Sequence, residues 1–64
     1  MMHPSEERRL RGLKAETWNL VFVFLDRQED ISPGEAAVAA TAAAEALEGA
    51  YRADKATIEE EGTP

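Results

Sequence analysis

ISPGE, residues 31–35, is the stretch that decides the fold, because it carries the clearest helix start in the chain. Ser32 and Glu35 have the Ser-x-x-Glu spacing of a capping box. In this motif the serine hydroxyl accepts from the amide of Glu35, and the carboxylate accepts from the amide of Ser32. Pro33 stands at the first helical position, where its fixed φ and missing N–H favour a helix. We therefore predict a turn at Ser32-Pro33 and a helix that begins there.

The residues after the turn predict one long helix over about residues 33–60. Eight of the eleven residues 36–46 are alanine, the strongest helix former. Larger apolar residues follow at Leu47, Tyr51 and Ile58, and their spacings of four and seven place them on one helical face. This half of the chain therefore offers a smooth surface of small side chains near the turn and bulkier ones farther away.

The residues before the turn also repeat with a helical period. One apolar stripe, which Thr17 also joins, runs through Leu10, Leu13, Leu20, Phe24 and Ile31, and a second stripe holds Trp18, Phe22 and Leu25. We predict a helix over about residues 5–30, capped by Ser5, with residues 1–4 and 62–64 disordered. A strand is the alternative for residues 20–25, because Val-Phe-Val-Phe has high β propensity. No other segment reads as a partner strand, so the helix is favoured.

Folding the two helices back at the turn gives an antiparallel hairpin in which residue i lies near residue 62 − i, within a few positions. Phe22 then faces Ala40 and Trp18 faces Ala44, so large side chains meet small ones, as close packing requires. The pattern predicts an all-α fold of two antiparallel helices. Gly12 and Gly49 also fall opposite each other, which indicates either a close backbone approach or two weakened helix ends.

A lone hairpin leaves apolar surface uncovered, because residues 20–25 are apolar all round and such a helix is buried on several sides. A chain of 64 residues without cysteine also lacks the disulfides that stabilise many small domains. We therefore expect a homodimer that forms a four-helix bundle. The residues expected at its interface or at a partner's interface are Trp18, Val21, Phe22, Phe24, Leu25, Leu47 and Tyr51.

Charge is unevenly distributed along this acidic chain, whose net charge is −6. Such a charge disfavours general nucleic-acid binding. Four of the seven basic residues nevertheless cluster at Arg8, Arg9, Arg11 and Lys14. This basic cluster either contacts an anion or an acidic partner, or neutralises the acidic second helix, including residues 59–61.

No set of residues in the sequence indicates catalysis, a cofactor or a metal. There is no cysteine, no Gly-rich phosphate loop, and only one histidine, His3. Glu45 and Glu48 have a spacing that can bind metal, but no histidine follows to complete a di-iron motif. The longest strongly apolar run has six residues, far fewer than the roughly 20 of a membrane span.

We therefore expect a non-enzymatic, soluble and cytoplasmic protein that acts as a small protein–protein interaction module, such as an adaptor, an inhibitor or a regulator. The alternatives are a nucleic-acid-linked regulator that uses the basic cluster, and an acidic mimic of nucleic acid.

Overall fold

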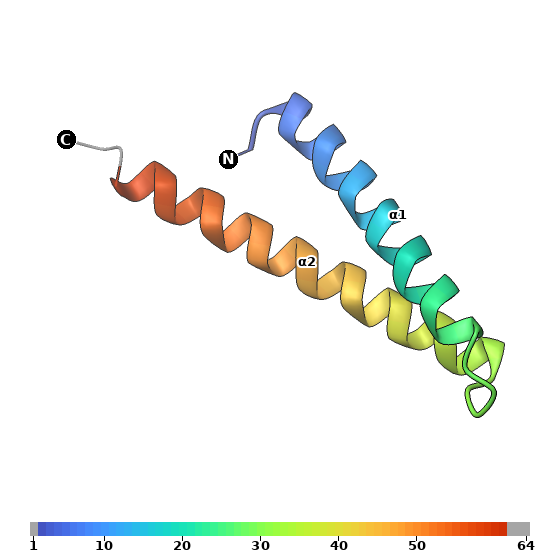
Figure 1. The fold of residues 1–64 in the computed structure, drawn as a ribbon. Coiled ribbons are helices and arrows are strands. Elements are labelled where there is room, and N and C mark those ends of the chain that lie inside the picture. Colours follow the sequence, from blue (N-terminus) through green and yellow to red (C-terminus); the bar gives the residue numbers. More distant parts are fainter. Residues whose placement is uncertain (1, 62–64) are drawn as a thin grey trace.

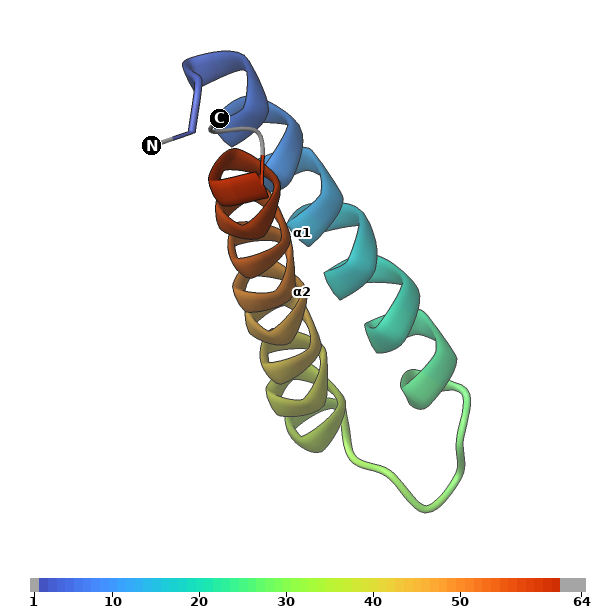
Figure 2. The same cartoon turned by 90° about the vertical axis from the view of Figure 1, so that its left-hand side faces the viewer.

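The computed structural model describes the backbone of residues 2–61 and the side chains of residues 2–56. Two helices, α1 (Pro4–Asp26) and α2 (Pro33–Glu61), pack against each other in antiparallel directions (Figure 1). The hairpin is elongated, with extents of 53 × 18 × 13 Å. A view turned by 90° shows the helices side by side, joined by an open loop (Figure 2). The predicted all-α fold is confirmed, and the strand alternative for residues 20–25 is wrong.

The first helix begins one residue earlier than predicted. His3, not Ser5, is the N-cap, and its Nδ1 accepts from the backbone N–H of Ser5 at 3.1 Å. The carbonyl of His3 also accepts from the amide of Glu6 at 2.9 Å. Pro4 fits the first helical position, and an imidazole nitrogen replaces the expected hydroxyl. Part of the segment predicted to be disordered is therefore helical, while Met1 and residues 62–64 lie outside the described residues.

The turn is longer than predicted, because α1 ends at Asp26 rather than near residue 30. The amide of Gln28 donates to the carbonyl of Leu25 at 3.0 Å and closes the helix end. At the other side of the turn, Ser32 Oγ accepts from the amide of Glu35 at 3.2 Å. The serine half of the predicted capping box is thus present, and it fixes the start of α2.

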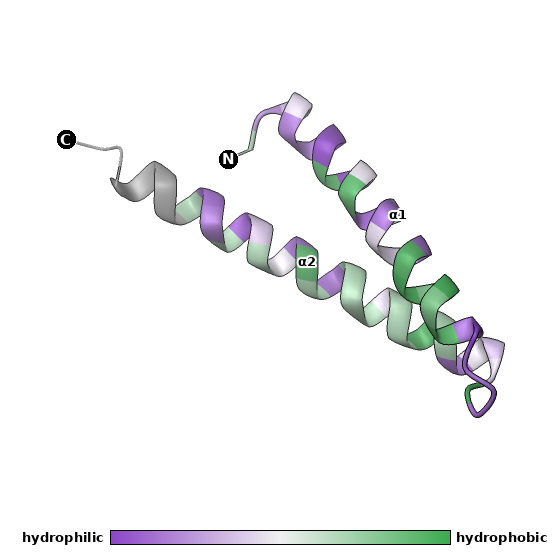
Figure 3. Ribbon diagram, in the orientation of Figure 1, coloured by the Kyte–Doolittle hydropathy of each residue, from purple (hydrophilic) through white to green (hydrophobic). Residues whose placement is uncertain are grey.

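The core of the hairpin is narrow and consists mostly of alanine. Leu10 is 1% exposed, and the other buried apolar residues in the part of the chain with described side chains are Ala36, Ala40 and Ala44. The contacts between Lys14 and Glu48 and between Trp18 and Thr41 agree with the predicted register to within three positions. Figure 3 shows that apolar residues gather in the half of the hairpin next to the turn, while the open half of α1 is mostly polar with a few apolar bands.

The two glycines do not create a close approach of the helices. A Cβ atom added at Gly12 or at Gly49 would meet no atom within 4 Å, and both residues are exposed. The second interpretation of the pair therefore holds, because each glycine only weakens its own helix. Over the described residues, neither helix is long and apolar enough to cross a membrane.

Candidate interaction surfaces

One flank of the hairpin carries a stacked aromatic pair. The rings of Trp18 and Phe22 lie 5.0 Å apart at an interplanar angle of 9°. Trp18 Nε1 donates to Thr41 Oγ1 at 3.1 Å, which fixes the indole against α2. Both aromatic side chains are half-buried. Phe22 is therefore half-buried rather than fully enclosed between the two helices.

A shallow groove runs along α2 beside this pair, and Thr41 belongs to both features. Its lining is mostly apolar and ends at a carboxylate; it consists of Ala37, Val38, Thr41, Ala42 and Glu45. Val38 is 72% exposed, the highest value among the large apolar residues of the described chain. We call the stacked pair and this groove together the aromatic flank.

The other side of α1 exposes a second apolar surface. Leu20 is 66% exposed and Phe24 is 65% exposed, and the two residues lie one helical turn apart. Leu13 and Thr17 are half-buried and continue the same stripe, with spacings of four, three and four from Leu13 to Phe24. We call these four residues the leucine stripe. It is part of the stripe that the sequence analysis identified, but α2 covers it only partly.

The predicted interface residues lie on different sides of the hairpin. Phe24 is exposed, and the half-buried residues are Trp18, Val21, Phe22, Leu25, Leu47 and Tyr51. Tyr51 also lies under the ammonium group of Lys55, which is 5.8 Å from its ring centre. The sequence prediction missed Leu20, Val23 and Val38 as exposed apolar residues. Periodicity alone does not show which side of an all-apolar segment the neighbouring helix covers.

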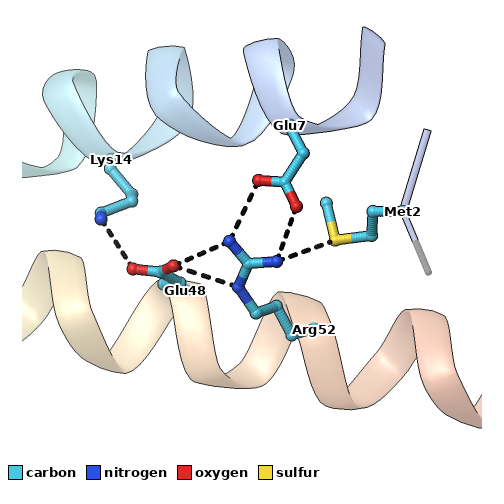
Figure 4. A network of polar contacts seen from close by, with 5 residues as sticks. All are labelled: Met2, Glu7, Lys14, Glu48 and Arg52. Carbon is cyan, nitrogen blue, oxygen red and sulfur yellow. Dashed lines mark hydrogen bonds and ion pairs between the residues drawn. The ribbon is translucent and has the colours of Figure 1, made fainter. Parts of the chain in front are cut away.

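A network of ion pairs joins the helices at the open half of the hairpin (Figure 4). The guanidinium group of Arg52 on α2 donates two hydrogen bonds, of 2.8 and 3.0 Å, to the carboxylate of Glu7 on α1. Its Nε donates to Glu48 at 3.0 Å, and Lys14 donates to the other oxygen of Glu48 at 2.6 Å. Arg52 also approaches the sulfur of Met2 at 3.6 Å. The network therefore links both helices through one guanidinium group.

The network shifts the acidities of its members. The bond from Arg52 holds the pKa of Glu7 below its ordinary value, and the bond from Lys14, followed by that from Arg52, does the same for the pKa of Glu48. The two carboxylates in turn raise the pKa of Arg52. Both carboxylates are thus held in the charged form, which makes them salt-bridge partners rather than proton donors or acceptors.

Among the described side chains, only one member of the predicted basic cluster forms an ion pair. Lys14 pairs with Glu48, whereas Arg8, Arg9 and Arg11 are exposed and form no ion pair with any described side chain. The pairs at this end instead join acids of α1 to bases of α2, as Glu6 to Lys55 at 3.6 Å also shows. Their charges are thus opposite to those expected, and the side chains of residues 59–61 lie outside the described part.

Among the described residues, no group of three or more His, Asp or Glu side chains converges on a point where a metal ion could bind. No protein-family model, no curated protein and no solved structure matches the chain. The candidate functional features are therefore surfaces: the aromatic flank, the leucine stripe and the exposed arginines of α1.

Proposed function

We propose that this protein is a small interaction module without catalytic activity, and that it works as a homodimer whose two hairpins form a four-helix bundle. The observation that carries the proposal is the exposure of Leu20 and Phe24, at 66% and 65%, next to each other on α1. Adjacent large apolar side chains on a small protein mark a contact surface. A second copy is the simplest cover, since two-fold pairing buries the same stripe on both chains.

The narrow core supports the same proposal. Among the described side chains, three of the four buried apolar residues are alanines, which contribute little apolar area. Burying the exposed two thirds of Leu20 and Phe24 on both chains would contribute roughly 4–8 kcal/mol, since full burial contributes about 1.5–3 kcal/mol for each side chain. Association costs on the order of 4–15 kcal/mol, so the gain is of the same size as the cost and the dimer should have modest affinity. Such a dimer would supply the apolar burial that 64 residues alone do not reach.

The aromatic flank stays accessible in this dimer and is the surface that we propose for a larger protein partner. Tryptophan is enriched among the residues that dominate binding energy, and Trp18 is already fixed by its bond to Thr41. The groove beside it ends at Glu45, which favours a partner segment that is apolar with one basic side chain. An adaptor, an inhibitor or a regulator would bind in this manner.

Sedimentation equilibrium tests the dimer directly. The wild-type protein should have a mass of about 14 kDa, twice that of the 7.0 kDa chain, at concentrations above its dissociation constant. The double variant Leu20→Glu/Phe24→Glu should be monomeric. Val38→Glu is the matched control, since Val38 is at least as exposed but lies on the aromatic flank. A wild-type monomer at millimolar concentration, or a Val38→Glu variant that dissociates equally, would contradict the proposal.

A second candidate function, a nucleic-acid-linked regulator, is favoured by one observation. Arg8, Arg9 and Arg11 are exposed and have no ion-pair partner among the described side chains. If they contact phosphates, RNA or DNA binding should weaken steeply with added salt and should be lost in Arg8→Ala/Arg9→Ala. An absence of binding at low salt would reject this candidate and leave the protein-interaction module.

A further inference from the structure

We infer that the two copies pack with their α1 helices antiparallel, so that the turn of each hairpin lies beside Arg9 of the other. This inference rests on the homodimer proposed above and adds its orientation and register. It follows from two independent features of the hairpin, the spacing of the leucine stripe and the distribution of unpaired charge.

The leucine stripe sets the register. Leu13, Thr17, Leu20 and Phe24 follow the four-three-four spacing of a helix seam that packs against a like seam. Two such seams, placed antiparallel and fully overlapped, bring residue i of one copy opposite residue 37 − i of the other. Leu13 then meets Phe24 of the second copy, and Thr17 meets Leu20. Each exposed side chain thereby contacts a less exposed member of the same stripe. This register follows from the apolar residues alone, without any use of the charged ones.

The unpaired charges agree with this register. It places Arg9, on the side of the leucine stripe, near Gln28 of the second copy, beside the acidic residues Glu29 and Asp30 of the turn, whereas Arg8 lies about 150° away from the stripe around the helix. Arg9, Glu29 and Asp30 are all exposed and form no ion pair with any described side chain of their own hairpin. The unpaired charges of the two copies thus have opposite signs and meet at both ends of the dimer.

The opposite orientation, with both turns at the same end, brings like charges together. Residues 26–35 contain four acidic residues and one basic residue, a net charge of −3. If the turns lay side by side, two segments with a net charge of −3 each would repel one another. The unpaired arginines of the two copies would also lie next to each other and repel. The apolar stripe is buried in either orientation, so charge complementarity selects between them and favours the antiparallel dimer.

Charge reversal in the full chain tests this orientation, with dimer dissociation constants measured at low salt. Arg9→Glu and Glu29→Lys/Asp30→Lys should each weaken the dimer by about tenfold, and the combined variant should restore it. Glu29→Lys/Asp30→Lys changes the net charge from −6 to −2, since two −1 charges become +1. The smaller net charge lowers the general repulsion between the two copies, which by itself would tighten the dimer. A weaker dimer can therefore come only from the loss of a local attraction. Circular dichroism should show unchanged helicity.

Two single variants with the same change in charge test whether the effect depends on the side of α1 that carries the arginine. Arg9 and Arg11 lie about 160° apart around the helix, and of the two only Arg9 is on the side of the leucine stripe. Arg9→Glu should weaken the dimer, whereas Arg11→Glu should not. The cysteine-free chain also permits Gln28→Cys, whose disulfide would form readily only if the turns were side by side.

The outcomes distinguish the two proposals. A wild-type monomer would remove both the homodimer and its orientation. A wild-type dimer with a readily formed Gln28→Cys disulfide, with equal effects of Arg9→Glu and Arg11→Glu, or with no recovery in the combined variant, would overturn only the antiparallel orientation.

Discussion

Replacing Leu10 with alanine tests the packing of the hairpin most directly. Leu10 is 1% exposed and is the largest fully buried side chain among the described residues. The change removes three carbon groups at about 0.8 kcal/mol each and leaves a cavity, so the free energy of unfolding should fall by about 3 kcal/mol. Domains of this length have total stabilities of roughly 3–10 kcal/mol. The variant should therefore keep only roughly 0–7 kcal/mol of stability and should unfold at a clearly lower urea concentration than the wild type.

Leu20→Ala is the matched control, because it removes the same atoms from a side chain that is 66% exposed. Urea unfolding followed by circular dichroism, at a protein concentration low enough to keep the chain monomeric, should show a cost below about 0.5 kcal/mol for Leu20→Ala. The reasoning is refuted if Leu10→Ala costs less than about 1 kcal/mol, or if the two variants cost the same. Either result would mean that α1 presents a different side to α2.

Three further predictions follow from the contacts of single residues. Phe22→Ala should lower the free energy of unfolding by about 1–2 kcal/mol, below the 3–5 kcal/mol typical of a fully buried aromatic, and should change the fluorescence of Trp18; a loss above about 3 kcal/mol would show that Phe22 is buried. Gly12→Ala and Gly49→Ala should each raise the free energy of unfolding, measured with urea, by about 1 kcal/mol, since an added Cβ meets open space at both positions. A decrease would show that these residues lie in a close contact. The pKa of Glu48 is lowered on folding, so its stabilising effect is present above the ordinary value of 4.5 and is lost as the pH falls through the lower folded value. Wild-type protein should thus lose more stability than Glu48→Gln on acidification, and parallel losses would contradict the role of the network.

The sequence predicted the features that depend on local chemistry. The cap at Ser32 lies where its spacing to Glu35 indicated, because a serine hydroxyl and a nearby amide need no distant partner. The register was predictable as well, since a turn between two helices leaves few ways to align them. The Lys14–Glu48 contact follows from this alignment to the residue.

Other features depend on competition between equally suitable groups, and there the sequence prediction failed. Residues 20–25 are apolar all round, so several faces of α1 could pack on alanine. The hairpin turns Leu20 and Phe24 outward, and periodicity holds no information about that choice. The same holds for the ion pairs, because arginine and lysine are long enough to reach several carboxylates. The early end of α1 at Asp26 reflects the chain length needed to reverse direction, which helix propensity does not measure.

The small core and the exposed stripe have a common physical origin. Alanine at positions 36, 40 and 44 lets α1 pack on α2 with minimal bulk, but each alanine removes little apolar surface from water. The bulky residues of α1 then exceed what one alanine face can cover, and Leu20 and Phe24 are left outside. A second copy would bury them, so part of the free energy that stabilises the folded hairpin should come from association. Because ligand or subunit binding to the folded state adds to stability by mass action, the unfolding midpoint should rise with protein concentration. The same dependence should vanish in Leu20→Glu/Phe24→Glu, whose hairpin would have only its own narrow core.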